Sequence, residues 1–166
     1  DKTAYIAKEH GARVVDEPYR GYGAACLKGV SELNEPEIVV FLDGDFSDFP
    51  EEIESLVNPI INNQADFVLG SRMLLPQSRI SLLPQARYGN LLAVFLLKLF
   101  FQHQFTDLGP FRAIRYKSLK ELKMVDKNFG WTVEMQIKAV KHGLCIKEVP
   151  VQYRKRIGVS KITGTI

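Results

Sequence analysis

The chain has 166 residues, of which 46% are hydrophobic and 25% are charged. This length favours one domain, and this composition excludes a disordered or fibrous protein. The net charge of +3 conceals an asymmetry: residues 1–71 carry 5 basic and 14 acidic side chains (net −9), whereas residues 72–166 carry 17 basic and 5 acidic ones (net +12). We infer from this that the first part binds a cation and the second a polyanion.

Two kinds of apolar run alternate along the first 71 residues. Some are short and β-branched, as in strands, and others have the spacing of an amphipathic helix. The segment 37–42 (EIVVFL) is nearly all apolar, which is typical of a strand buried on both faces of a parallel sheet. In chain order, this part predicts the end of a helix over 3–10, a strand over 12–15, a helix over 21–33, the strand 37–42, a helix over 50–61 and a strand over 66–70.

The second part continues this alternation. In chain order it predicts a long loop over 71–84, a helix over 85–101, a strand over 111–115, helices over 117–124 and 130–142, and a strand over 145–153. Pro150 predicts that the last strand lies at a sheet edge or contains a bulge. The alternation favours an open α/β sheet with helices on both faces. Because the chain begins within a predicted helix, we expect one domain over residues 1–166 that lacks its first strand and is truncated at its C-terminus.

The segment 91–101 (LLAVFLLKLFF) is strongly apolar. It has 11 residues and includes Lys98, whereas a helix needs about 20 apolar residues to cross a bilayer. We therefore predict that it does not span a membrane. Two interpretations stay open: a helix that covers the core or the sheet, and a helix that contacts a membrane surface or a lipid acceptor.

Cys26 and Cys145 are the two cysteines, and they lie far apart in the sequence. Both are flanked by apolar residues, so we interpret them as small core side chains and expect no zinc site. Unpaired thiols fit a reducing compartment, which predicts a cytoplasmic protein or one at the cytoplasmic face of a membrane. The basic stretch 154–156 is not accompanied by an aromatic nucleic-acid motif, so we expect no nucleic-acid partner.

The acidic motif Asp43-Gly44-Asp45 directly follows the predicted strand 37–42. In open α/β sheets, ligands bind at the carboxyl ends of strands. Two carboxylates this close repel each other unless a cation lies beside them. Mg²⁺ or Mn²⁺ would relieve that repulsion and leave coordination positions for diphosphate oxygens. The motif predicts a divalent-metal site at Asp43 and Asp45, whereas Asp48, just before Pro50, is typical of a helix cap.

Three functions are compatible with this motif after a strand. One is a metal-dependent transferase that uses a nucleotide-sugar. Another is a phosphatase of the haloacid dehalogenase type, with Asp43 as nucleophile and Ser47 as the hydroxyl that follows the second aspartate. Such a phosphatase needs a second acidic pair downstream, and residues 72–166 hold only five scattered acidic side chains. The third is a non-catalytic module that keeps the core but does not turn over a substrate.

Several short motifs occur in a characteristic order along the chain. They are DKT at 1–3, RGYGAA at 20–25, DGD at 43–45, GSR at 70–72, TDLGPFR at 106–112 and EVP at 148–150, followed by Arg156, Ser160 and Lys161. In this order they resemble the motifs of the family 2 glycosyltransferases, especially the branch similar to dolichyl-phosphate mannosyltransferase. The resemblance implies the GT-A fold, a Rossmann-like three-layer α/β/α sandwich with a mostly parallel sheet. It also implies inverting transfer of a sugar from a UDP- or GDP-linked donor to a polyprenyl phosphate or a glycan.

The resemblance also implies roles for individual residues. Asp45 would bind the metal, Asp43 the metal or the ribose of the nucleotide, and Gly44 would belong to the same nucleotide-sugar site. The donor or acceptor phosphates would face a set of cations: Arg72, Arg87, Arg112, Arg156 and Lys161. A hydroxyl acceptor would need a general base, for which Asp107 and then Glu134 are candidates, whereas an acceptor phosphate is already ionised and needs little help from one.

Overall fold

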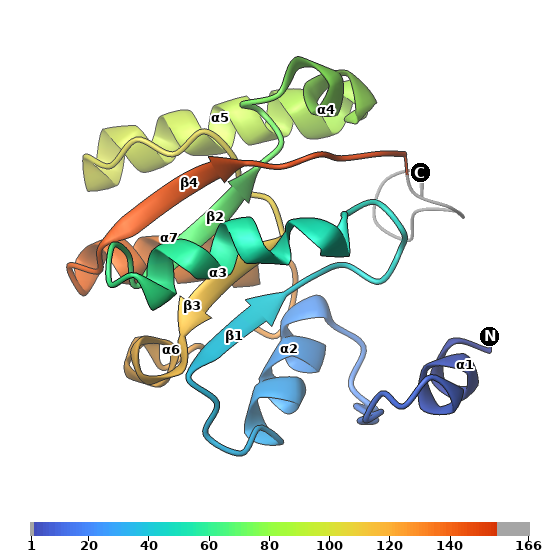
Figure 1. Ribbon diagram of the computed structural model, residues 1–166. Helices are drawn as coiled ribbons and strands as arrows, with labels where there is room; N and C mark the ends of the chain where they lie inside the picture. The colour runs from blue at the N-terminus through green and yellow to red at the C-terminus, as the bar shows by residue number, and fades with distance from the viewer. Residues whose placement is uncertain (1, 156–166) are drawn as a thin grey trace.

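The structure, a computed structural model, describes residues 2–155. Its four strands form one sheet in the order β1-β3-β2-β4 (Figure 1). The strands are β1 (Ile38–Phe41), β2 (Phe67–Ser71), β3 (Arg112–Arg115) and β4 (Ile146–Pro150). β2 and β4 are parallel, whereas β3 is antiparallel to both β1 and β2. Three strands thus share one direction, but the sheet is mixed rather than mostly parallel because β3 runs the other way between them.

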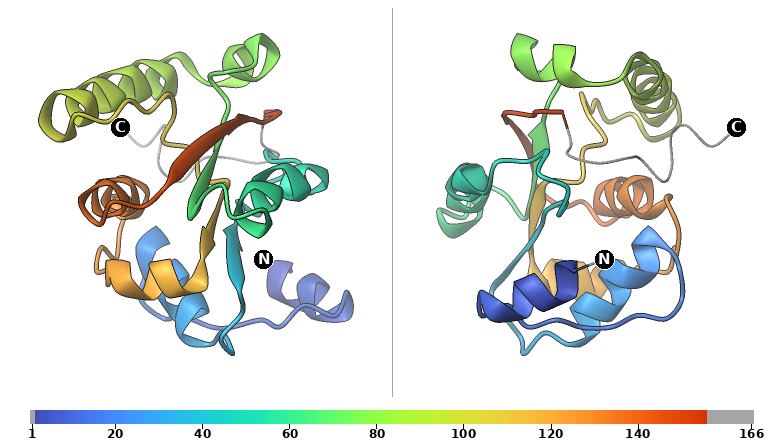
Figure 2. Two further views of the ribbon diagram at one scale, coloured as in Figure 1. Left: turned by 60° about the vertical axis from the view of Figure 1, so that its left-hand side comes forward. Right: turned by 90° about the vertical axis from the view of Figure 1, so that its right-hand side faces the viewer.

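Helices cover both faces of the sheet, as Figure 2 shows edge-on. On one face lies α3 (Ile53–Ile61), preceded by the short 3-10 helix η1 (Pro50–Glu52). On the other face lie α2 (Tyr22–Ser31), α6 (Tyr116–Leu122) and α7 (Trp131–Lys141). Side chains alternate along the strands: Phe67 and Leu69 pack with the α7 side, and Val68 between them packs with α3. The predicted three-layer α/β/α architecture is confirmed.

Three sequence-based expectations about the elements are wrong. Residues 12–15 form no strand. The loop predicted over 71–84 contains the helix α4 (Pro76–Ser81), which Pro76 opens at a position where a proline needs no amide hydrogen. The segment 37–42 is not buried on both faces, because β1 lies at an edge of the described sheet and only Val39 of its residues is buried. The remaining helices are α1 (Thr3–Glu9), which buries no side chain, and α5 (Pro84–Phe101).

The apolar helix α5 covers the core with only part of its surface. Asn90 and Leu97 are buried, and α5 packs against α7. Leu92, Phe95 and Leu99, spaced along one side of the helix, are each about 60% exposed. Within residues 2–155, no helix has the length and hydropathy to cross a membrane. The core interpretation of 91–101 therefore accounts for only one side of this helix.

The cysteines are less buried than their sequence neighbours suggested. Cys26 is half-buried against the core, but Cys145 is exposed and donates to the Gln64 carbonyl. Cys145 directly precedes β4, an edge strand, so the apolar residues that follow it do not enclose it. The expectation of two core cysteines is wrong for Cys145.

Candidate active site

Four segments meet at the edge of the sheet where β1, β2 and β4 end. This edge is distinct from the lateral edges that β1 and β4 form. β1, β2 and β4 end at this edge, and the antiparallel β3 begins there, since Phe41 and Leu69 both lie opposite Arg112 and Ser71 lies opposite Pro150. The edge therefore gathers the loop after β1, the residue after β2, the loop before β3 and the segment after β4. Open α/β sheets bind ligands at this end of their strands.

The loop after β1, residues 42–48, is the acidic loop, and its own side chains fix its shape. The Asp43 amide donates to Asp48 Oδ2 at 3.2 Å. The Ser47 amide donates to Asp45 Oδ1 at 3.0 Å, and the Ser47 hydroxyl donates to the same oxygen. Asp48 does not cap the following helix as predicted, because its carboxylate turns back to Asp43 and the cap position, Phe49, has no side-chain hydrogen bond. The two predicted metal ligands, Asp43 and Asp45, thus lie on one loop whose shape is held by internal hydrogen bonds.

Asp48, the last residue of this loop, has a buried side chain. It is 3% exposed, and its Oδ1 atom accepts no hydrogen bond from residues 2–155. Burial, with smaller effects from the charges of Asp43 and Asp45, raises its pKa to about 6, against the lowering by the Asp43 amide. The ionised form of Asp48 is therefore disfavoured in the folded, metal-free protein.

This raised pKa predicts that the metal-free protein loses stability as the pH rises. The folded state binds the Asp48 proton more tightly than the unfolded chain, so its contribution is complete below pH 4 and is lost as the pH passes about 6. A rise in the pKa of Asp48 from 3.8 to about 6 corresponds to about 3 kcal/mol in the free energy of unfolding. Urea unfolding in EDTA between pH 4 and 7.5 should show this loss, and Asp48→Asn, which keeps an oxygen for the Asp43 amide, should remove it. An unchanged slope in that variant would contradict the prediction.

The donor set of the acidic loop fits a hard divalent cation. Carboxylate oxygens are what Mg²⁺ and Mn²⁺ prefer, and the Asp48 Oδ1 atom accepts no hydrogen bond from the described residues. In the described part of the chain, no group of three or more His, Cys, Asp or Glu side chains could hold a metal. Two carboxylates such as Asp43 and Asp45 suit an ion that keeps most of its positions for waters and phosphate oxygens.

Arg72 is held at this edge by Asp107. Its Nε and Nη2 atoms donate to the two Asp107 oxygens at 2.7 Å each, and the Arg72 and Leu108 amides donate to the same carboxylate. Asp107 is fully buried, and 14% of the Arg72 side chain is exposed. Burial opposes the charge of Arg72, but Asp107 outweighs it and raises the pKa, so Arg72 stays a cation. This geometry makes Asp107 the residue that orients Arg72 and argues against its predicted role as a general base.

Glu134 is also fully engaged. It accepts from Lys138 at 2.7 Å and from the amides of Val125 and Asp126 at 2.9 and 2.8 Å. Burial raises its pKa, but the bonds from Lys138 and the amides outweigh burial and bring the pKa below its ordinary value. Glu134 therefore ties the start of α7 to the preceding turn, and this arrangement does not favour its predicted role as a base.

Two other predicted phosphate ligands that the structure describes, Arg112 and Arg87, do not join Arg72 at the site. Arg112 is fully buried and donates to the carbonyls of Leu108, Gly109 and Thr132, and burial lowers its pKa to about 10. Its expected phosphate role is not compatible with this burial. Arg87 is exposed in the first turns of α5. Arg156 and Lys161 lie outside the described residues.

The glycines in the turn at the start of α2, Gly21 and Gly23, allow the backbone there to pack closely against residues 126–128. A Cβ atom at Gly21 would lie 2.1 Å from the Lys127 carbonyl oxygen, and one at Gly23 would lie 2.0 Å from the Asp126 oxygen. The amides of Gly23 and Ala24 donate to carbonyls of residues 127 and 128. Glycine is required here for close backbone approach.

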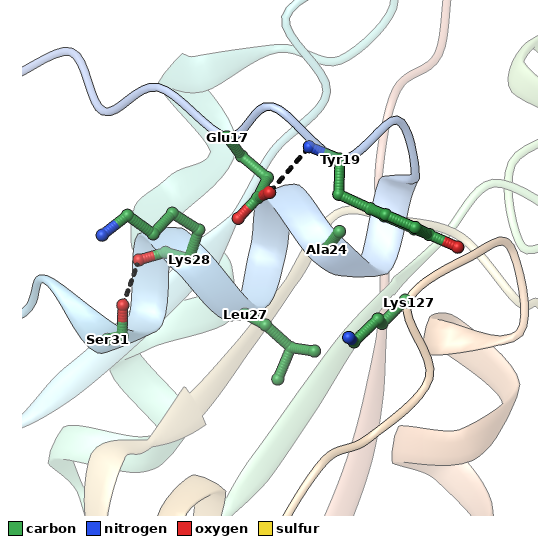
Figure 3. A pocket seen from close by; sticks show the side chains of 7 residues that line it. All are labelled: Glu17, Tyr19, Ala24, Leu27, Lys28, Ser31 and Lys127. Atoms are coloured by element: carbon green, nitrogen blue, oxygen red, sulfur yellow. Dashed lines mark hydrogen bonds between the residues drawn. The ribbon is translucent and has the colours of Figure 1, made fainter.

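A hollow of about 310 Å³ lies beside this turn along α2, with Glu17 and Tyr19 on one side and Lys127 on the other (Figure 3). Its polar groups are largely engaged: the Tyr19 amide donates to Glu17 at 2.8 Å, and Lys28 pairs with Glu32. None of the lining residues belongs to the acidic loop. The hollow is therefore separate from the sheet-edge site.

Sequence reasoning assigned no site role to Glu148 or Tyr153, and it did not predict the contact of Arg154 with the acidic loop. Glu148 accepts from the Thr106 amide and hydroxyl at 2.9 and 3.0 Å, which anchors the loop that carries Asp107. The Arg72 guanidinium lies 5.0 Å from the centre of the Tyr153 ring, and Arg154 contacts the acidic loop. The EVP motif marked Glu148, but its partners lie about 42 residues away, and no local pattern indicates them.

Comparisons with known proteins place this architecture in a family. The family model described as glycosyl transferase family 2 matches residues 1–123. An uncharacterised glycosyltransferase of Mycobacterium tuberculosis is 33% identical over all of this chain and 75% of its own length. A dolichyl-phosphate hexose transferase of Haloferax volcanii is 32% identical over 98% of this chain and 69% of its own length.

The fold also matches a solved structure. Glucosyl-3-phosphoglycerate synthase of Mycobacterium tuberculosis, in complex with Mn²⁺, UDP-glucose and phosphoglyceric acid, gives a TM-score of 0.72 at 21% identity. The match covers 96% of this chain and 58% of that protein, and at this identity it shows the GT-A fold alone. The phosphatase hypothesis is set aside, since the family model matches and the Ser47 hydroxyl is buried against Asp45. The chain belongs to the family 2 glycosyltransferases.

Proposed function

We propose that this glycosyltransferase transfers a sugar, with inversion, from a UDP- or GDP-linked donor to a polyprenyl phosphate, and that it depends on Mg²⁺ or Mn²⁺. The observation that carries the proposal is the meeting of the Asp43–Asp45 motif and the Asp107-bound Arg72 at one sheet edge. A nucleoside diphosphate has the two features that such a pair recognises, since it carries a divalent ion and negatively charged phosphates.

The chemistry requires charge stabilisation at the leaving diphosphate. A divalent ion held by Asp43 and Asp45 would neutralise the negative charge that develops there. Arg72 is already oriented by Asp107, so it can face a phosphate without reorganisation. The named relatives support the donor and metal classes, since the solved synthase was crystallised with Mn²⁺ and UDP-glucose.

The ion pairs and hydrogen bonds of the two candidate bases favour a phosphate acceptor over a hydroxyl acceptor. Asp107 is paired with Arg72, and Glu134 is paired with Lys138 and two amides. An acceptor phosphate is ionised near neutral pH and attacks without a base, whereas a hydroxyl acceptor needs one. The dolichyl-phosphate names of relatives in Haloferax volcanii and Methanococcus voltae point the same way.

The exposed side of α5 suits an acceptor that resides in a membrane. Several of its large apolar side chains are exposed to solvent. The segment from residue 67 to 106, which includes α4 and α5, contains no Asp or Glu. Arg79, Arg87 and Lys98 lie on α4 and α5. Apolar side chains bordered by cations and free of acids match the surface of a membrane that contains anionic lipids. We propose that α4 and α5 rest on the cytoplasmic face of such a membrane.

Replacing Leu92, Phe95 and Leu99 together by Ser should weaken binding to vesicles that contain anionic lipid by at least about tenfold. Each of these side chains would bury apolar surface in the lipid, worth about 1.5–3 kcal/mol at full burial. Vesicle co-sedimentation measures the effect, and the matched control is Ile61→Ser with Phe129→Ser, which removes similarly exposed apolar side chains elsewhere. Unchanged vesicle binding, or a dimer in analytical ultracentrifugation that the triple variant dissociates, would overturn the membrane proposal.

The function itself is tested by calorimetry with a panel of UDP- and GDP-sugars in the presence of Mn²⁺, on this chain and on an N-terminally extended one. Mn²⁺-dependent binding of one donor, followed by transfer of labelled sugar to a polyprenyl phosphate, is the expected result. Donor binding with transfer only to a hydroxyl acceptor would overturn the acceptor class. Binding by neither chain would favour the non-catalytic module.

A further inference from the structure

Residues 151–154, which follow β4, form a strap across the sheet-edge site. The strap backbone accepts from the Ser78 hydroxyl and donates to it and to the Ser71 carbonyl, at 3.0 to 3.2 Å. The Tyr153 ring lies against the Arg72 guanidinium. The strap thus connects the residues after β2 with α4, and its last residue reaches the acidic loop.

Arg154 contacts the acidic loop through both the backbone and the side chain of the arginine. Its guanidinium carbon lies 3.3 Å from the centre of the Phe46 ring and 4.2 Å from that of Phe49. The side chain donates to the carbonyls of Phe46 and Asp48, and the Arg154 amide donates to the Ser47 carbonyl at 3.0 Å. A guanidinium stacked on two rings and bonded to their loop restrains the backbone strongly.

Phe46 needs such a restraint. Its φ angle is +69°, in the left-handed region that bulky residues rarely adopt. Its ring is 53% exposed, so burial in the core does not hold it there. A backbone in a sparsely populated conformation persists only when its surroundings determine it. Phe46 lies directly between Asp45 and Ser47, which bond to each other, so its conformation sets the shape of the metal-binding motif.

We propose that Arg154 is a positioning residue that holds Phe46 in its left-handed conformation and thereby presents Asp43 and Asp45 to the divalent ion. The metal part rests on the proposed function. Arg154 acts on the ion through the loop, and its own charge works against a cation. The two effects have opposite signs. Loss of positioning weakens metal binding, whereas loss of the positive charge alone strengthens it.

The test compares Arg154→Ala with the wild type in two measurements. Amide exchange by NMR in the metal-free protein should become at least about tenfold faster at Asp43 and Ser47, whose amides bond within the loop. Mn²⁺ binding, measured by EPR with Mn²⁺ alone, should weaken at least about tenfold. Lys117→Ala removes one exposed charge from α6, beyond the opposite end of β3, and should change neither measurement.

Two further variants separate positioning from charge. Arg154→Lys keeps the charge but loses the planar stack, so its amide exchange should match that of the alanine variant and its Mn²⁺ binding should weaken at least as much. Phe46→Asn in the Arg154→Ala background should restore most of the Mn²⁺ affinity and of the slow exchange, because Asn tolerates a positive φ. Unchanged exchange in Arg154→Ala, tighter Mn²⁺ binding, or no recovery by Phe46→Asn would overturn the proposal. If the wild type binds no Mn²⁺, the proposed function fails at its metal, and the exchange rates still decide the role of Arg154.

Discussion

Asp45→Asn should abolish Mn²⁺-dependent binding of the nucleotide-sugar donor while the protein stays folded. The amide of Asn has the shape of the carboxylate and keeps an oxygen for the Ser47 amide, so the loop should retain its geometry. The charge that attracts the ion is lost. Substitution of a residue that contacts a metal ligand typically lowers metal affinity by about 10–100-fold. Substitution of a direct ligand should therefore lower the Mn²⁺ affinity by at least about 100-fold. Calorimetry of the donor with and without Mn²⁺ measures this loss.

A matched control separates the lost charge from a general electrostatic effect. Glu121→Gln also removes one negative charge, but Glu121 is exposed on α6, which starts where β3 ends and hence beyond the opposite edge of the sheet. It should leave donor binding unchanged. The stability of Asp45→Asn in EDTA should equal or slightly exceed that of the wild type, because one of several clustered carboxylates loses its charge. If Mn²⁺-dependent donor binding persists in Asp45→Asn, Asp45 is not a metal ligand.

The position of the acidic loop could be predicted because its signals are local. The apolar segment 37–42 indicates a strand, and a motif directly after a strand must lie at the end of that strand. The structure places β1 at Ile38–Phe41 and the acidic loop directly after it. The sequence of alternating runs also predicted the helices on both faces. These inferences depend on spacing within about ten residues, which a single sequence records.

The roles of the arginines could not be predicted in this way. Arg72 and Arg112 both belong to short motifs at strand ends, and both resemble phosphate ligands. Arg112 is buried because it begins β3, the strand between β1 and β2, so that Phe41 and Leu69 flank it on both sides. Arg72 stays at the edge because Asp107, 35 residues away in the sequence, holds it there. Burial and pairing of this kind arise from strand order, and strand order leaves no local pattern in the sequence.

Asp107→Asn should have the largest effect on stability, with a loss of about 3–5 kcal/mol in the free energy of unfolding. The substitution leaves the Arg72 guanidinium largely buried without its carboxylate, and an uncompensated buried charge is costly. Glu35→Gln is the matched control. It breaks the Lys120–Glu35 pair, whose side chains are 51% and 78% exposed, so it should cost less than about 1 kcal/mol. Urea unfolding of both variants measures the difference.

A second substitution distinguishes the two roles of the Arg72–Asp107 pair. Arg72→Met in the Asp107→Asn background removes the stranded charge, so most of the lost stability should return. Donor binding should not return with it, because the cation proposed to face the diphosphate is gone. Recovery of both would mean that the pair serves only the fold. If stability recovers and donor binding does not, Asp107 acts on the donor by orienting Arg72, and the buried ion pair at this sheet edge is retained for function at a cost in stability.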